Sequence, residues 1–280
     1  MSGHTGPDVV VVDDGVVAGR GGEIPVRDYR PASPAARTAL LWVHGGGFTS
    51  GGLDQQESDA PARFLAAAGT PVRTVDYRLA PRALPWRDPD LTPHPGRYPA
   101  GLDDVVDVAR ALIEASGGPI AIGGGSAGAN LAAATVLRLR DEGLPLPRSA
   151  VLAYGTFHAV LPEDEQVESE LSGILAKWAF NPTMTRRMNL NYVGEPGALA
   201  PGYPFPGGAD LRDFPPTLLV DARNDRLRKS GHTFAAELRA AGSEVRETVV
   251  EAQHGFLNKP RKPAFATGMR DIAAWLTAHD

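Results

Sequence analysis

The chain has 280 residues, a length that suits one large α/β domain or two small ones. Its formal net charge of −5 gives no electrostatic reason to expect a nucleic acid or an anionic membrane as partner. The absence of cysteine excludes disulfides, thiolate chemistry and cysteine-based zinc sites. The amino terminus has no signal-peptide pattern, and no stretch approaches the roughly 20 apolar residues that span a bilayer. We therefore expect a soluble, cytoplasmic protein that does not insert into membranes.

Short apolar runs alternate with helical patterns along the chain, which predicts βαβ units and a largely parallel sheet. The expected strands are Val9–Val12, Ile24–Tyr29, Thr38–Val43, Val72–Asp76, Ile120–Gly123, Ala150–Tyr154, Thr217–Asp221 and Glu244–Val250. The turn-rich segments Asp13-Asp14-Gly15 and Gly21-Gly22 separate the first two of them. Pro25 suits the second strand only at its start or at a sheet edge.

Helical patterns fill most of the connections between these strands. Asp59 is typical of an N-cap with Pro61 in the first turn, and Gly69 ends that helix. The other expected helices are Gly101–Ser116, Ser126–Glu142, Gln166–Phe180, Pro182–Val193, Ser230–Gly242 and Pro263–His279. The segment Arg82–Tyr98 is rich in Pro, Asp and Arg, and we interpret it as a loop.

The alternation of strands and helices stops between Gly155 and Pro216. A connection this long inside a compact domain is usually functional, so we interpret residues 156–213 as a helical cap or lid inserted into a single domain of residues 1–280. The alternative is a surface excursion that packs elsewhere.

A candidate nucleophile lies in Gly124-Gly-Ser126-Ala-Gly128, between an apolar strand and a helix. A serine on such a sharp turn has strained backbone dihedrals, and the flanking glycines let neighbouring segments approach without a Cβ clash. The turn exposes the Ser126 hydroxyl at a helix N-terminus, which favours a developing anion. The alternative is a glycine-rich junction with an incidental serine.

A candidate oxyanion hole follows an earlier strand, in His44-Gly-Gly-Gly47. The backbone N–H groups of Gly46 and Gly47, with that of Ala127 after the serine, can point at one position and stabilise a tetrahedral oxyanion. A flexible loop and a phosphate-binding loop are the alternatives, but no Gly-Lys-Ser/Thr follows. His44 is expected to be a structural hydrogen-bonding residue.

The base should follow the last strand, and His254 is the histidine in that position. The acid that orients its imidazole should lie on the facing loop. Asp225 is the better candidate, and Asp221, in the same segment, stays the alternative. Glycine loop, serine, aspartate and histidine then follow one another in the order found in α/β-hydrolases.

Six segments resemble the hormone-sensitive-lipase-like family of α/β-hydrolases. They are His44-Gly-Gly-Gly-Phe48, Asp76-Tyr-Arg-Leu-Ala-Pro81, Gly124–Asn130, Phe214-Pro-Pro216, Asp225-Arg-Leu-Arg228 and His254-Gly-Phe256. The resemblance runs from about Ile24 to the C-terminus. It implies an eight-stranded, mostly parallel sheet under a cap and the hydrolysis of carboxylic esters with short or medium acyl chains. It also implies Ser126, Asp225 and His254 as the triad.

The chain departs from the family pattern at several positions. Gly125 stands where Asp or Thr usually precedes the nucleophile, Ala129 replaces a customary glycine, and Arg226 stands where proline is common. The glycine loop comes early in the sequence, so we expect the N-terminal cap segment of the family to be shortened or missing. These departures leave the triad intact, but they weaken the inference from the family's substrate preference to that of this chain. A deacylase dedicated to one metabolite is as plausible as a general esterase.

Together these residues predict a serine hydrolase that works through an acyl-enzyme and needs no metal or organic cofactor. Phe48, Trp86, Trp178 and Phe180 are candidates for the pocket walls, although each suits the core equally well. Related chemistry on the same triad stays open: amide, formamide or lactone hydrolysis, acyl transfer or elimination. A non-catalytic receptor is a further alternative. The expected partner is a small-molecule ester, not nucleic acid, and a homodimer is compatible with the sequence.

Overall fold

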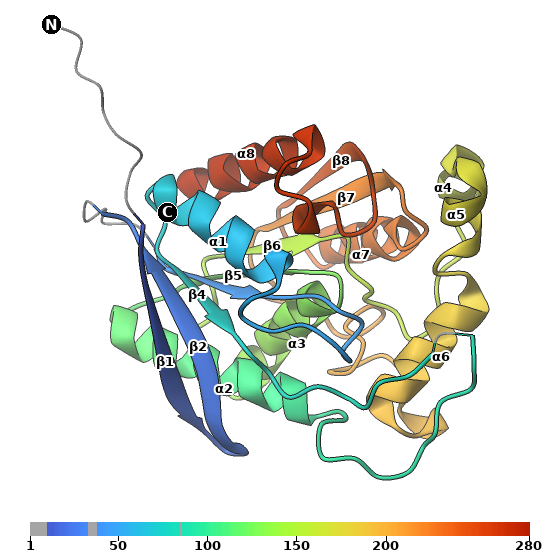
Figure 1. Ribbon diagram of the computed structural model, residues 1–280, viewed down its shortest axis with the longest axis horizontal. Helices are drawn as coiled ribbons and strands as arrows, with labels where there is room; N and C mark the ends of the chain where they lie inside the picture. The colour runs from blue at the N-terminus through green and yellow to red at the C-terminus, as the bar shows by residue number, and fades with distance from the viewer. Residues whose placement is uncertain (1–9, 33–37, 85) are drawn as a thin grey trace, which may run out of the picture.

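Eight strands form one mixed sheet in the computed structural model, which describes residues 10–32, 38–84 and 86–280 (Figure 1). The strands are β1 (Val11–Gly19), β2 (Gly22–Arg30), β3 (Leu40–Val43), β4 (Val72–Val75), β5 (Ala121–Gly125), β6 (Ser149–Ala153), β7 (Thr217–Asn224) and β8 (Val245–Gln253). Their order is β1-β2-β4-β3-β5-β6-β7-β8. Strands β3 to β8 are parallel, whereas β1 and β2 pair antiparallel. The predicted mostly parallel eight-stranded sheet is confirmed.

Helices cover both faces of this sheet (Figure 1). They are α1 (Gln56–Ala67), α2 (Ala100–Ser116), α3 (Ala127–Asp141), α4 (Glu165–Glu170), α5 (Gly173–Trp178), α6 (Pro182–Val193), α7 (Arg228–Ala240) and α8 (Pro263–Ala278), with short 3-10 helices η1 (Pro196–Ala198) and η2 (Phe256–Asn258). In the described part of the chain, none of the helices is long and apolar enough to cross a membrane.

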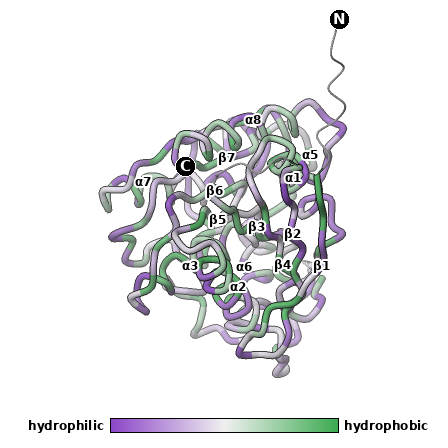
Figure 2. Tube along the Cα trace, turned by 90° about the vertical axis from the view of Figure 1, so that its left-hand side faces the viewer, coloured by the Kyte–Doolittle hydropathy of each residue, from purple (hydrophilic) through white to green (hydrophobic). Residues whose placement is uncertain are grey.

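Two hydrophobic cores lie on opposite faces of the sheet. Successive side chains of a strand point to opposite faces of a sheet, and β3 shows this alternation. Its residues Leu41 and Val43 belong to the core under α2, α3 and α7. Its residues Leu40 and Trp42 belong to the core under α1 and α8. Hydrophilic segments lie mainly at the periphery (Figure 2).

The predicted turn at Asp13-Asp14-Gly15 is wrong, because β1 continues through it to Gly19. Ion pairs across the hairpin link Asp13 to Arg30 and Asp14 to Arg27, and they hold these aspartates in an extended ribbon. The part of the expected strand at Val9 lies outside the described residues. The chain reverses direction between Gly19 and Gly22, at the second of the two turn-rich segments.

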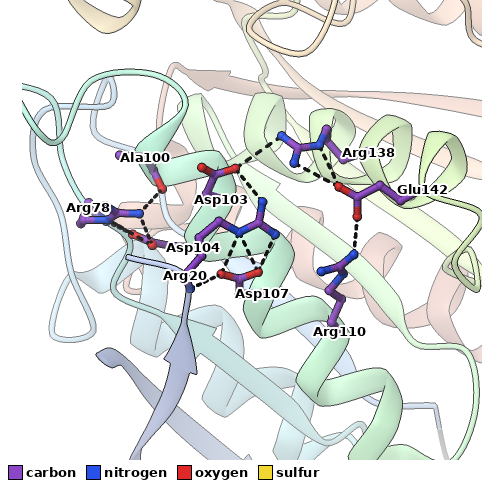
Figure 3. Close-up of polar contacts among 9 residues, drawn as sticks. All are labelled: Arg20, Arg78, Ala100, Asp103, Asp104, Asp107, Arg110, Arg138 and Glu142. Atoms are coloured by element: carbon purple, nitrogen blue, oxygen red, sulfur yellow. Dashed lines mark hydrogen bonds and ion pairs between the residues drawn. The ribbon is translucent and has the colours of Figure 1, made fainter. Parts of the chain in front are cut away.

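Charged side chains attach this hairpin to the helices beside it (Figure 3). Arg20 donates its backbone N–H to Asp107 over 2.8 Å, and its guanidinium contacts both Asp107 and Asp103 of α2. Arg138 of α3 approaches Asp103 to 3.4 Å. The network links the β1–β2 hairpin to α2 and α3.

The helix α1 begins earlier than predicted, so Pro61 lies inside it and not in its first turn. A proline has no N–H to give to the carbonyl four residues earlier. Here the indole Nε1 of Trp42 donates to that carbonyl, of Glu57, over 2.8 Å. A side chain of the sheet thus replaces the missing helical hydrogen bond.

The segment between β6 and β7 holds α4, α5 and α6. The single helix expected over Gln166–Phe180 is in fact two short ones, separated near Gly173, whose positive φ of 81° interrupts the helical path. The helix Pro182–Val193 matches its prediction, and the Asn181 side chain caps it by accepting the N–H of Met184. Figure 1 shows α4, α5 and α6 beside one end of the sheet.

Candidate active site

The candidate catalytic residues gather at one edge of the sheet. Ser126 follows β5, the glycine loop follows β3, Asp225 follows β7 and His254 follows β8. These strands are parallel, so their carboxyl ends meet at the same edge. Segments that lie far apart in the sequence therefore share one site.

The turn between β5 and α3 raises the Ser126 side chain. Ser126 has φ 53° and ψ −119°, a combination that L-residues rarely adopt. A Cβ atom on Gly128 would lie 2.1 Å from the carbonyl oxygen of Val43, so only glycine fits there. The structure thus has the strained strand-to-helix turn that the sequence predicts at Ser126.

A chain of hydrogen bonds joins serine, histidine and aspartate. The Nε2 atom of His254 lies 3.0 Å from the Ser126 Oγ, and its Nδ1 atom lies 2.6 Å from Oδ2 of Asp225. The other oxygen of Asp225 accepts the backbone N–H of Leu227 over 3.0 Å. The carboxylate is buried and doubly held, and it fixes which imidazole nitrogen faces the serine.

The charge of Asp225 also sets the protonation of the imidazole. Burial lowers the pKa of His254, but the charge of Asp225, its hydrogen bond and the charge of Glu57 raise it by more. The pKa therefore lies above the ordinary value of 6.5. A raised pKa strengthens the imidazole as a base for the serine proton.

The alternative acid, Asp221, is buried within β7, and the two ring nitrogens of His254 face Asp225 and Ser126 instead. Burial, and then the charge of Asp225, raise the pKa of the Asp221 carboxyl well above its ordinary value. This favours the neutral acid, which could not balance an imidazolium. Of the two aspartates, the geometry brings only Asp225 to the histidine.

The glycine loop turns sharply beside Ser126. Gly46 has φ 118° and Gly47 has φ 60°. A Cβ atom on Gly46 would lie 1.9 Å from the carbonyl oxygen of Ser50, so the loop needs glycine there. Both glycines line the cavity that contains Ser126, and Ala127 begins α3, where backbone N–H groups have no partner within the helix.

His44 holds the base of this loop. Its Nδ1 lies 2.7 Å from the Gly45 carbonyl oxygen, and its ring stacks on Tyr77 with centroids 4.4 Å apart. Burial lowers the pKa of His44 to about 4, so the ring is neutral at pH 7. These contacts agree with a structural residue.

A cavity of about 420 Å³ opens over Ser126 and His254. Its walls come from the glycine loop, the 82–98 segment, the segment between α5 and α6, α6 itself and the segment after β8. The lining residues include Gly46, Gly47, Leu84, Arg87, Ser126, Phe180, Met184, Arg187, Met188 and His254. The cavity is mainly apolar beside the serine and has two arginines among its walls.

Of the four aromatic residues expected in the pocket walls, one lies along this cavity. Phe180 lines the cavity, with its ring 4.5 Å from that of His254. Phe48 is a correction, because it is 2% exposed and stacks on Tyr192 in the core. Trp86 and Trp178 are corrections too: they are 59% and 54% exposed and do not line this cavity. Trp86 and Trp178 each stand next to a lining residue, Arg87 and Ala179, so a place beside the site in the sequence did not bring their side chains into it.

Three residues that the sequence analysis did not single out line the site. Glu57 accepts hydrogen bonds from Gly45, Tyr154 and Asn258, and no motif marks it. Met184 and Met188 of α6 were also missed. Their spacing of four residues places both on one helix face, a pattern that could have identified them.

Among the described residues, no group of three or more His, Cys, Asp or Glu side chains is placed to hold a metal ion. The described site is thus built from a hydroxyl, an imidazole, a carboxylate and backbone amides. These groups suit acyl transfer.

Known proteins share this arrangement of sequence and fold. A family model described as the alpha/beta hydrolase fold matches residues 40–258. The carboxylesterase NlhH of Mycobacterium tuberculosis is 34% identical over 249 residues, which are 84% of this chain and 72% of the relative. The ethyl acetate hydrolase of Pseudomonas putida is 30% identical over 254 residues, 85% of this chain and 72% of the relative.

Solved structures agree with these relatives. The esterase of Pyrobaculum calidifontis superimposes with a TM-score of 0.83 at 29% identity, over 98% of this chain and 88% of that one. The chain therefore belongs to the α/β-hydrolases, in the hormone-sensitive-lipase-like family that its motifs resemble.

Proposed function

We propose that this carboxylesterase-type serine hydrolase cleaves short- or medium-chain acyl esters, with Ser126 as nucleophile, His254 as base and Asp225 as the acid that orients it. The observation that carries the proposal is the hydrogen-bonded chain from Ser126 Oγ through His254 to Asp225, at the floor of the cavity. The backbone of Ser126 has a strained, positive φ, which is typical of a nucleophile turn.

The reaction follows from the placement of these groups. Ser126 Oγ attacks the ester carbonyl carbon while Nε2 of His254 takes the hydroxyl proton. The N–H groups of Gly46, Gly47 and Ala127 hold the oxyanion. When the tetrahedral intermediate collapses, the ester C–O bond breaks and His254 gives its proton to the leaving alcohol. His254 then takes a proton from a water molecule, whose oxygen attacks the acyl carbon. As the bond between the acyl carbon and Ser126 Oγ breaks, His254 returns this proton to Oγ and the carboxylic acid leaves.

The cavity supports a small acyl group. Its volume of about 420 Å³ must hold both the acyl chain and the alcohol, and Phe180, Met184 and Met188 offer apolar contact. One relative is named for ethyl acetate hydrolysis, which points to the short end of the range. We expect acetyl and butyryl esters to be better substrates than long-chain esters.

We further propose that residues 156–213 act as the cap of this site. Their helix α6 supplies Met184 and Met188 to the cavity wall. Within the segment, the Asn189 side-chain amide donates to the carbonyls of His158 and Ala159 over 3.1 and 3.0 Å. These bonds tie α6 to the segment that follows β6 and keep its lining face over the serine.

The proposal is tested with p-nitrophenyl esters of increasing acyl length and with a fluorophosphonate probe. The wild-type protein should release p-nitrophenol with multiple turnovers, and mass spectrometry should place the probe on Ser126. Ser126→Ala should lose both signals while keeping its thermal transition. Ester binding without turnover would instead indicate a receptor, and acyl products with an added alcohol would indicate acyl transfer.

A further inference from the structure

Glu57 is a buried carboxylate beside the active site that the proposed reaction does not use. It lies in the first turn of α1, is 1% exposed and is among the residues that line the cavity with Ser126. Burying a charged group is costly unless hydrogen bonds compensate for the lost water. The contacts of Glu57 therefore show what the fold uses it for.

Three donors meet this carboxylate, and each belongs to a segment of the site. Oε2 accepts the backbone N–H of Gly45 over 2.6 Å, directly before Gly46. Oε1 accepts the hydroxyl of Tyr154 over 2.5 Å and the side-chain amide of Asn258 over 3.0 Å. A carboxylate only accepts, so it satisfies all three donors at once.

Two of these donors lie next to the histidine. The Tyr154 ring packs edge-on against the His254 ring, with centroids 5.1 Å apart. Burial, and then the charge of Glu57, raise the pKa of Tyr154 well above its ordinary value, so its hydroxyl keeps the proton that it donates. Asn258 ends the short helix η2, which begins two residues after His254.

Gly125 leaves the space that this carboxylate occupies. A Cβ atom there would lie 2.8 Å from both Cδ and Oε1 of Glu57 and 3.0 Å from the Tyr154 hydroxyl oxygen. Gly125 does not have a positive φ, so its backbone accepts any L-residue. The obstacle to a side chain before the nucleophile is thus the Glu57 carboxylate, held in place by its three hydrogen bonds, together with Tyr154.

We propose that Glu57 is a positioning residue for the proposed ester hydrolysis, and that it is sterically coupled to Gly125. Its carboxylate fixes the entry to the oxyanion loop through Gly45 and the ring that backs His254 through Tyr154. It can do so because position 125 has no side chain. The first part of this inference rests on the proposed function, whereas the coupling does not.

The first experiment compares two buried carboxylates. Glu57→Gln keeps the shape but replaces one acceptor oxygen with a donor. Either the Gly45 N–H then loses its acceptor, or the Tyr154 hydroxyl and the Asn258 amide must turn to accept instead of donating. When the N–H groups of the oxyanion hole are misaligned, they stabilise the transition state less, whereas binding of the ester in its ground state changes little. For p-nitrophenyl acetate we expect kcat to fall at least about tenfold with KM within about twofold, and the rate of fluorophosphonate labelling to fall in parallel.

Asp104→Asn is the matched control, because Asp104 is also buried but bonds to Arg78 and does not line the cavity. It should lower the melting temperature and leave kcat per folded molecule within about twofold. The positioning role is overturned if Glu57→Gln keeps the wild-type kcat, or if Asp104→Asn loses kcat to the same extent.

The second experiment is a double-mutant cycle with Gly125→Ala and Glu57→Ala, read in both kcat/KM and melting temperature. Gly125→Ala should lower both in the wild-type background and cost clearly less beside Glu57→Ala. Additive effects would overturn the coupling. If Glu57→Ala does not fold, Glu57→Ser takes its place in the cycle. The melting temperature reports the steric coupling without turnover, so a failed esterase proposal is distinguished from a failed coupling.

Discussion

Arg78 and Asp104 form a pair joined by several hydrogen bonds, away from the active site (Figure 3). The Asp104 carboxylate accepts the backbone N–H of Arg78 over 2.8 Å, its Nε over 2.9 Å and its Nη2 over 2.8 Å. Asp104 is buried on α2, whereas Arg78 lies in the segment after β4. The pair thus fixes the segment that leads from the sheet into the 82–98 loop.

Removing the arginine should cost stability and leave the chemistry intact. In Arg78→Ala the Asp104 carboxylate stays buried but loses its charged partner, which we expect to lower the free energy of unfolding by about 1–3 kcal/mol. Urea denaturation followed by circular dichroism measures this. The kcat per folded molecule should stay within about twofold, and a kcat loss of tenfold or more in fully folded protein would contradict a purely structural role.

The two aspartates of the β7 segment should differ sharply in their effect on turnover. Asp225→Asn keeps the shape but no longer balances the imidazolium and favours the wrong tautomer, so kcat should fall by about 10³–10⁴. Asp221→Asn should stay within about threefold, because the raised pKa of Asp221 already favours its neutral form, which asparagine resembles. Steady-state kinetics on p-nitrophenyl acetate decides, and equal losses would mean that Asp221 is needed for chemistry.

Local sterics explain why so much of this site could be predicted. The carbonyl of Val43 leaves no room for a side chain at Gly128, and Ser50 leaves none at Gly46, so both glycines appear in the sequence as recognisable motifs. The alternation of strands and helices likewise predicts parallel β3 and β5, whose ends place Ser126 beside the glycine loop. These are constraints that neighbouring residues impose on one another.

Residues that are far apart in the sequence and meet only in the folded structure left no such pattern. Glu57 meets Tyr154 although 97 positions separate them, and only the fold brings them together. The departure at Gly125 then has a structural reason that the sequence alone did not contain. Aromatic walls were mispredicted for a related reason: which way Trp86 or Trp178 points depends on the path of an irregular segment, and no periodicity reports it.

The pH dependence of turnover should report the charges around His254. Asp225 and Glu57 are the acidic groups that raise its pKa above 6.5, Tyr154 stays protonated beside it, and the guanidinium of Arg187 lines the same cavity. Only the neutral imidazole accepts the serine proton, so kcat/KM should fall as the pH decreases through this raised pKa.

The Glu57→Gln variant tests the sign of that effect. Removing a negative charge makes the imidazolium less favourable, so the midpoint of the acid limb should move to lower pH than in the wild type. Profiles of kcat/KM between pH 5 and 9, on a buffer series of constant ionic strength, measure the midpoint. A midpoint that stays in place or rises would show that Glu57 does not act on His254 through its charge.

Phe180 and Trp178 provide a matched pair for testing the pocket wall. The Phe180 ring lies 4.5 Å from His254 and lines the cavity, whereas Trp178, two residues earlier, is mostly exposed and does not. Truncating a ring that contacts substrate should cost about 1–2 kcal/mol of transition-state binding, so Phe180→Ala should lower kcat/KM for p-nitrophenyl butyrate about tenfold. Trp178→Ala should change it less than about twofold. The Trp178→Ala variant controls for removal of an aromatic ring from the same segment. An equal decrease of kcat/KM in both variants would mean that this segment, and not the Phe180 ring itself, determines the fit of the acyl chain.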